Sequence, residues 1–236
     1  MKRLLLASAV LGLVGTICTT KADVITSDTV TIWNAPTPGA TPDSISQLGL
    51  PTAVGLFGGP LPLVAASTPF ASPINYDDPA GGTNTIPGFF ASDSPPAPTP
   101  ATCTGACLTD PLSLAGNAQT TVFRFTFTET TGEIFTVIHD DGVSLFVKGT
   151  ETTTCTIASC PGDLLPTSAA NTTFATPTSV KIGPGTYDLW YAEAQGLPAV
   201  LKATSVVPEP GSMTLTLLGS ALAGLGWFVR RRRKAV

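Results

Sequence analysis

Two adjacent aspartates are the side chains of this sequence best suited to holding a metal ion. Asp140 and Asp141 stand between the single histidine, His139, and Gly142. Calcium takes six to eight oxygen ligands, carboxylates prominent among them, so both aspartates are candidate calcium ligands. Two carboxylates do not complete such a site. Asp-Gly is also a hairpin-turn signal in which Asp140 would accept nearby backbone N–H groups, and this alternative is favoured.

Catalytic chemistry has few residues to use here. His139 would have to serve any Ser-His-Asp or Cys-His arrangement, and no Gly-x-Ser-x-Gly sequence is present. A glycosidase needs two carboxylates across a cleft, for which Asp140 or Asp141 would have to pair with Asp188 or Glu193. We expect no catalytic residue and no enzymatic activity, and a glycan-active enzyme is the least favoured alternative.

Four cysteines lie in the central part of the chain, at Cys103, Cys107, Cys155 and Cys160. Paired cysteines are typical of disulfides in exported proteins, whose compartment is oxidising. Three pairings are open, and two local loops are the simplest. A four-thiolate zinc site is the alternative, which the wide spacings and the compartment disfavour.

Strand patterns on both sides of the aspartates would position them. Phe123, Phe125 and Phe127 alternate with polar residues, which predicts a strand with one aromatic face. A second strand is predicted at residues 134–139, and Asp141-Gly142 predicts a two-residue hairpin that leads to a returning strand.

The remaining segments complete an all-β pattern. Residues 29–33 predict a first strand, residues 180–192 a hairpin around a Gly-Pro-Gly turn, and residues 199–205 a last strand. Gly88-Phe89-Phe90 is interpreted as a loop excursion or irregular edge strand, and residues 95–100 as an extended Pro-rich connector. The expected fold is an antiparallel, jelly-roll-like β-sandwich with an irregular Pro/Gly-rich N-terminal portion.

The order of these segments supports a family resemblance. Phe125-Thr126-Phe127, then residues 132–147 with their Asp-Asp-Gly turn, then residues 185–193 resemble the centre of the anthrax protective-antigen-type β-sandwich domain. That family includes carbohydrate-binding modules and adhesins with calcium-dependent glycan sites. The resemblance implies a glycan-binding sandwich, with Asp140 and Asp141 as its calcium ligands.

The C-terminal end combines three features, in the order Pro208-Glu209-Pro210, an uncharged apolar run at residues 211–229, and the basic cluster Arg230, Arg231, Arg232, Arg233 and Lys234. At about 1.5 Å rise per residue the apolar run nearly spans a hydrocarbon core of roughly 30 Å, as a single transmembrane helix. The cations would stay on the cytoplasmic side.

This tail resembles the PEP-CTERM protein-sorting signal of Gram-negative bacteria, and an ordinary C-terminal anchor is the alternative. The resemblance implies that an exosortase cuts near Pro208-Glu209-Pro210. The protein would be anchored in the membrane before cleavage and would then move to the cell surface or extracellular matrix.

The N-terminal end predicts export as well. Met1-Lys2-Arg3 is basic, an apolar segment follows, and Thr20-Lys21-Ala22 is a candidate cleavage site, as in a signal peptide. The predicted organisation is a signal peptide at 1–22, a Pro/Gly/Thr-rich region with the first strands at 23–119, the sandwich core at 120–205, and the sorting signal at 206–236.

The charge of the region between the two ends restricts its partners. Residues 23–207 hold four cations against 15 acidic residues, a net charge of −11. This argues against nucleic acid and anionic lipid as partners, and it is compatible with divalent cations, with neutral glycans, or with solubility alone. We expect a non-catalytic module that associates with exopolysaccharide, with calcium as the candidate cofactor. A structural matrix protein without a ligand is the alternative.

Overall fold

The computed structural model describes residues 22–35, 63–67, 69–93, 96–113, 120–151, 161–165, 176–193 and 196–207. All of the described helices and strands belong to one compact unit, Ala22–Val206. The predicted signal peptide, the apolar run and the basic tail lie outside the described residues. Within the described ranges, no helix has the length and apolar character needed to cross a bilayer.

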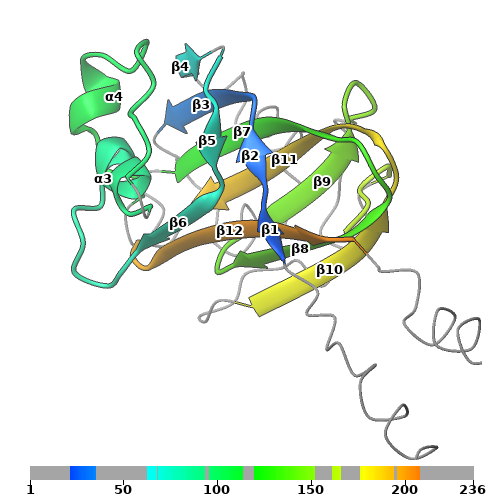
Figure 1. Cartoon of the computed structure of the whole chain (residues 1–236). Helices are drawn as coiled ribbons and strands as arrows, with labels where there is room; N and C mark the ends of the chain where they lie inside the picture. The colour runs from blue at the N-terminus through cyan, green and yellow to red at the C-terminus, as the bar shows by residue number, and fades with distance from the viewer. Residues whose placement is uncertain are drawn as a thin grey trace, which may run out of the picture. The chain divides into compact units, whose positions relative to one another are not determined.

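Two five-stranded antiparallel sheets form the sandwich (Figure 1). The first sheet consists of β1 (Asp23–Val24), β6 (Asn75–Asp78), β8 (Glu133–His139), β10 (Thr176–Ile182) and β12 (Ala199–Val206). Strand β12 pairs with β1, β6 and β8, and β8 also pairs with β10.

The second sheet has the order β4-β3-β7-β11-β9. Its strands are β3 (Thr29–Ala35), β4 (Leu63–Ser67), β7 (Thr120–Glu129), β9 (Val143–Val147) and β11 (Gly185–Glu193). Strands β2 (Thr26–Ser27) and β5 (Ser72–Pro73) form a small separate sheet.

From β6 to β12 each successive strand lies in the opposite sheet, which is the connectivity of a jelly roll. The prediction of an all-β antiparallel sandwich is confirmed. The predicted first strand is also present, because β3 pairs with β7 through Val30 and Phe125.

Aromatic side chains hold the two sheets together. Alternation along β7 turns the side chains of Phe123, Phe125 and Phe127 inward, and all three are fully buried. Phe127 stacks on Phe135 of β8 with ring centroids 5.5 Å apart. Phe125 stacks on Tyr76 of β6 at 5.7 Å. These contacts place the aromatic face of β7 in the core between the sheets.

Both predicted hairpins are wrong, because the paired segments belong to different sheets. Strand β8 pairs with β10 and β12, whereas β9 pairs with β11, so Asp140-Asp141-Gly142 crosses between the sheets. Gly183 and Pro184 likewise join β10 in one sheet to β11 in the other. The turn residues set the local backbone, but strand partners are chosen by long-range burial of the inward faces.

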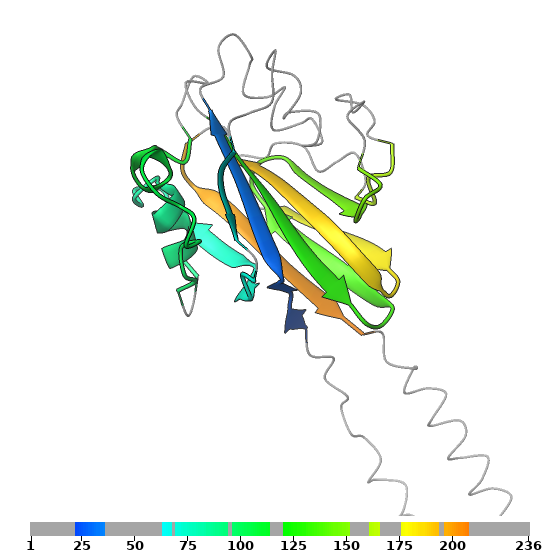
Figure 2. The ribbon, with the colours of Figure 1, turned by 90° about the horizontal axis from the view of Figure 1, so that it is seen from above.

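A short helix, α3 (Ile86–Ala91), replaces the loop or edge strand predicted at Gly88-Phe89-Phe90. The Thr85 side chain accepts the N–H of Gly88, and a proline lies in the first turn. Phe89 and Phe90 are buried, and α3 contacts both β6 and the second short helix, α4 (Ala106–Thr109). Figure 2 shows the two helices together beside β6. Helix α3 therefore packs against one end of the sandwich.

Candidate functional site

The crossing after β8 carries the predicted aspartates into the interior of the sandwich. Asp140 and Asp141 are each only 4% exposed. Oδ1 of Asp140 accepts the backbone N–H groups of Asp141 and Val200, both at 3.0 Å, and lies 2.8 Å from the Tyr191 hydroxyl. Asp140 therefore connects the crossing to β12 and β11 by hydrogen bonds.

The Tyr191 hydroxyl joins Asp140 to a second buried carboxyl group, that of Glu193, whose Oε2 lies 2.7 Å away. A hydroxyl has one proton, so it can donate to only one of its two carboxyl neighbours. Burial raises the pKa of Glu193 well above its ordinary value, and the charges of Asp141 and Asp140 raise it further. Glu193 is therefore the neutral acid that donates to Tyr191, which donates to Asp140.

The opposite oxygen of Glu193 connects this cluster to two loops. The Ser113 hydroxyl donates to Glu193 Oε1 at 2.8 Å, and the Gly196 N–H donates to Ser113 Oγ at 2.8 Å. Asn84 donates to the Ser113 carbonyl at 2.7 Å. Asp140, Tyr191, Glu193 and Ser113, which we call the carboxyl cluster, thus link the Pro/Gly-rich portion to the core strands.

His139 is buried and neutral rather than solvated. Its Nδ1 lies 2.7 Å from the Asp141 carbonyl oxygen, which can only accept, so Nδ1 carries the proton. Nε2 then accepts the Thr178 hydroxyl at 3.3 Å. Burial lowers the pKa of His139. The Nε2 bond therefore joins β8 to β10, while the Nδ1 bond holds the crossing that follows β8.

The calcium site at Asp140 and Asp141 stays a prediction from the sequence. In the described ranges, no group of three or more His, Cys, Asp or Glu side chains is arranged to hold a metal. Asp163 accepts the N–H groups of Leu145 and Leu165 at 2.9 and 3.0 Å. These bonds hold the segment at residues 163–165 against β9. Asp140 and Asp163 thus both accept backbone N–H groups of the protein.

Of the carboxylates considered for glycoside hydrolysis, Asp140 and Glu193 lie close together, both bonded to the Tyr191 hydroxyl and both buried, whereas Asp188 lies apart from them. Asp188 and Glu193 lie an odd number of positions apart on β11, so their side chains leave opposite faces. Asp188 accepts the Thr126 hydroxyl on the outer face, while Glu193 belongs to the carboxyl cluster inside. Asp188 therefore lies on the opposite face of β11 from the carboxyl cluster to which Asp140 belongs.

Cys103 and Cys107 form a disulfide with an S–S distance of 2.00 Å. Cys155 and Cys160, the sorting motif Pro208-Glu209-Pro210 and the basic tail lie outside the described residues.

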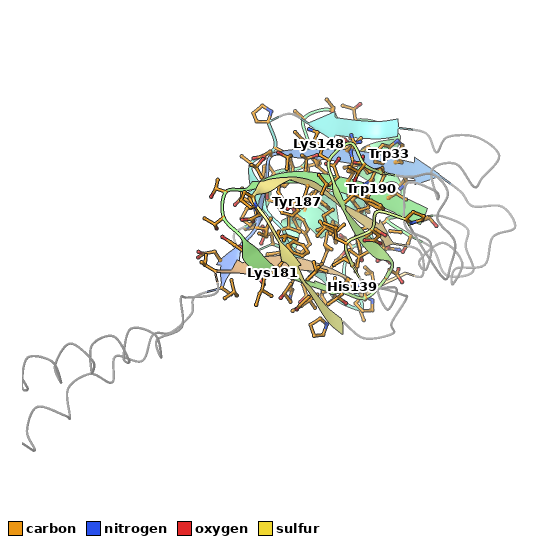
Figure 3. All side chains as sticks on the ribbon, turned by 90° about the vertical axis from the view of Figure 1, so that its right-hand side faces the viewer. Trp33, His139, Lys148, Lys181, Tyr187 and Trp190 are labelled. Atoms are coloured by element: carbon orange, nitrogen blue, oxygen red, sulfur yellow. A yellow bond between two sulfur atoms is a disulfide. The ribbon has the colours of Figure 1, made fainter. Side chains whose placement is uncertain are left out.

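A second constellation lies on the outer side of the β4-β3-β7-β11-β9 sheet. The rings of Trp33 on β3 and Trp190 on β11 stack with centroids 5.3 Å apart and an interplanar angle of 12° (Figure 3). The Arg124 guanidinium, on the central strand β7, lies 5.6 Å from the first ring centroid and 5.5 Å from the second. We call Trp33, Arg124 and Trp190 the tryptophan face.

The tryptophan face is only partly open to solvent. Trp190 is 5% exposed, whereas Trp33 and Arg124 are half-buried. Tyr191, next to Trp190, faces the core, as strand alternation predicts for one of the two. Sequence reasoning missed Trp33 and Arg124 as site residues. Strand alternation could have predicted that both side chains leave the outer face, because their sequence neighbours Ile32 and Phe123 are apolar. The sequence could not predict the cross-strand register that brings the two residues together.

Comparison with known proteins identifies the C-terminal end. The PEP-CTERM protein-sorting motif matches residues 206–233. The chain carries a PEP-CTERM sorting signal. A search of curated proteins found no match.

The PEP-CTERM signal sets the route of this protein. It marks an exported protein that an exosortase processes and that reaches the cell surface. The matched residues include Pro208-Glu209-Pro210 and the four arginines from Arg230 to Arg233, in agreement with the prediction from sequence. The sandwich is therefore the part of this PEP-CTERM protein that is presented outside the cell.

Proposed function

We propose that the sandwich is a non-catalytic module that associates with extracellular polysaccharide through the tryptophan face. The observation that carries the proposal is the stacked pair Trp33 and Trp190, with Arg124 against both rings, on the outer side of a sheet. Core side chains of this fold point inward, so two tryptophans gathered on the outer face need another explanation.

Aromatic rings suit sugars because a pyranose has an apolar side that can lie against a ring, while its hydroxyl groups need polar partners at the edge. Around the tryptophans the same face offers the Thr31 hydroxyl and the Asp188 carboxyl group. Thr31 already accepts Arg124 Nη2 at 3.2 Å, so these polar groups are held in place beside the rings.

Two donors on this face support a ligand. Among the described residues, Trp190 Nε1 and Arg124 Nε have no hydrogen-bond partner, although both atoms are buried. Buried donors are nearly always paired in folded proteins, and an unpaired one costs about 1–3 kcal/mol. A ligand or water that enters between the side chains would satisfy them.

The absence of catalysis is part of the proposal. The carboxyl cluster is buried and its oxygens accept protein donors, which suits a structural role. The acidic charge of the exported region disfavours nucleic acid as the partner. The sequence predicts calcium as a cofactor, whereas the three donors that Asp140 Oδ1 already accepts argue against an ion at that atom.

The test is retention of the full chain, purified in detergent, on exopolysaccharide isolated from the producing cells. Trp33→Ala should weaken retention about tenfold or more, because it removes the more exposed ring of the pair. Leu108→Ala is the matched control, since Leu108 is 47% exposed and lies on helix α4, not on a strand of the sheet.

Equal retention of wild type and Trp33→Ala would exclude the tryptophan face as the binding site. A wild-type protein that is not retained at all would favour the structural matrix protein without a ligand. Turnover of the polysaccharide that is lost with a single carboxylate substitution would establish the enzyme alternative.

A further inference from the structure

We infer that Arg124 makes the tryptophan face selective for sugars that carry a carboxylate, as uronic acids do. This inference rests on the proposed function and names the class of polysaccharide that the same site takes. Arg124 is the only arginine between Arg3 and Arg230, and it stands on β7, the central strand of its sheet.

The charge of Arg124 has no protein counterion among the described residues. Within the part of the chain that the structure describes, its side chain makes one hydrogen bond, from Nη2 to the Thr31 hydroxyl, and Nε has no partner. The ion pair found in the described ranges is that of Lys202 with Asp77, at 2.5 Å. A half-buried cation without a carboxylate is unusual in a region with 15 acidic residues, because desolvation of an unpaired charge is costly.

The nearest acid in the cross-strand register is directed elsewhere. Trp190 is the β11 partner of Arg124, and Asp188 lies two residues before it on the same face. Asp188 takes hydrogen bonds from Thr126 and from Glu151 instead. Burial and that hydrogen bond to Asp188 raise the pKa of Glu151, which favours its neutral, donating form. Asp188 is therefore engaged by other side chains, and no ion pair joins it to Arg124 among the described residues.

A carboxylate on a sugar ring fits what is left. The planar guanidinium presents parallel N–H groups that match a carboxylate in a two-point hydrogen bond. The half-buried ring of Trp33, the more exposed of the stacked pair, would hold the apolar side of the sugar at the same time. The surrounding acidic domain repels polyanions at long range, so recognition depends on this one local cation.

The experiment compares two soluble polymers, polygalacturonate and dextran, in affinity electrophoresis of the full chain in detergent. The wild type should be retarded at least about tenfold more strongly by polygalacturonate. Arg124→Gln should lose that preference. Arg124→Lys should keep only part of the preference, because an ammonium group lacks the two parallel N–H donors of a guanidinium. Lys148→Gln, which removes an exposed cation after β9, should leave the preference unchanged.

Three results would overturn the inference. Equal retardation by both polymers, unchanged in Arg124→Gln, would reject carboxylate selectivity and leave polysaccharide association intact. An equal loss in Lys148→Gln would attribute the preference to overall charge. No retardation by either polymer, or by the native exopolysaccharide, would reject the proposed function as well.

Competition keeps the test independent of folding of the variants. Free galacturonate should displace the wild type from polygalacturonate, whereas free galactose at the same concentration should not. Equal displacement by both sugars would show that the protein does not recognise the carboxylate of the sugar.

Discussion

The single proton of the Tyr191 hydroxyl sets the charge state of the carboxyl cluster. It lies between Asp140 and Glu193, and both acids are buried. Burial raises the pKa of Asp140, and hydrogen bonds from Val200 and Tyr191 offset part of that rise. Burial raises the pKa of Glu193 well above its ordinary value, and the charges of Asp141 and Asp140 raise it further. One anion and one neutral acid place a proton in each of the two short contacts of the Tyr191 oxygen, whereas two anions would leave one contact without a proton.

Stability should therefore fall as the solution becomes alkaline. The folded-state pKa of Glu193 is raised above its ordinary value of 4.5, so the folded protein binds more protons than the unfolded chain. The stability from Glu193 is fully present below pH 4.5 and is lost as the pH rises through the folded pKa. Glu193→Gln, which mimics the neutral acid, should flatten this decline in thermal melts across pH.

Glu129→Gln is the matched control for that prediction. Burial and the charge of Glu133 raise the pKa of Glu129 to about 7. Glu129 also contributes stability that is lost as the pH rises, but this loss should be centred at lower pH and largely finished just above about pH 7. A pH profile of Glu193→Gln that matches the wild type would contradict the assignment of the neutral acid.

Calcium should not stabilise this protein. Asp140 Oδ1 is already surrounded by three donors, and the described residues assemble no metal site around it. A thermal melt of the full chain should give the same midpoint with excess calcium and with chelator. A native-state ion at about 100 times its dissociation constant would add about 2.7 kcal/mol. A shift abolished by Asp140→Asn and Asp141→Asn would contradict our interpretation and restore the calcium site.

Among the elements, α3 shows how a short segment can be decided by its tertiary contacts. Six residues form a marginal helix in isolation. Phe89 nevertheless lies in an aromatic cluster, with ring centroids 4.7 Å from Tyr76, 4.9 Å from Phe123 and 5.9 Å from Tyr191. The helix persists because both sheets and the carboxyl cluster pack around that ring.

Phe89→Ala should lower the free energy of unfolding by about 3–5 kcal/mol, because it leaves a cavity among rings that cannot close it. Urea unfolding followed by fluorescence measures the effect. Leu108→Ala, at an exposed position on α4, should change stability by no more than about 0.5 kcal/mol. A loss below about 1 kcal/mol for Phe89→Ala would mean that the end of the sandwich repacks freely.

At the scale of the whole molecule, the sorting signal and the folded sandwich occupy consecutive parts of the chain. The PEP-CTERM motif spans residues 206–233, whereas the sandwich ends with β12 at Val206. Processing can therefore proceed without disturbing the strands.

Replacement of Pro208-Glu209-Pro210 by three alanines should block processing and leave the protein in the membrane fraction at its uncleaved mass. Cell fractionation and mass spectrometry in an exosortase-containing host measure this. Asp77→Asn, which removes an exposed acid from the sandwich, should be processed normally. Unchanged release of the alanine variant would show that exosortase does not read this motif.

The sequence by itself determined the properties that depend on neighbouring residues. The alternation of apolar and polar residues predicted the strand at Phe123, Phe125 and Phe127, because every second side chain of a strand points to the same face. The sorting signal was readable because its three parts are consecutive in the chain. The sandwich class followed from the number of short strands without long helices.

Tertiary structure alone decided which distant segments meet. Asp141-Gly142 specifies a turn but not the sheet in which the next strand pairs, so the crossing replaced a hairpin. The meeting of Asp140 with Glu193, and of Trp33 with Trp190, depends on register across strands far apart in sequence. Register is fixed by burial of whole strand faces in the folded state, and no local pattern encodes it.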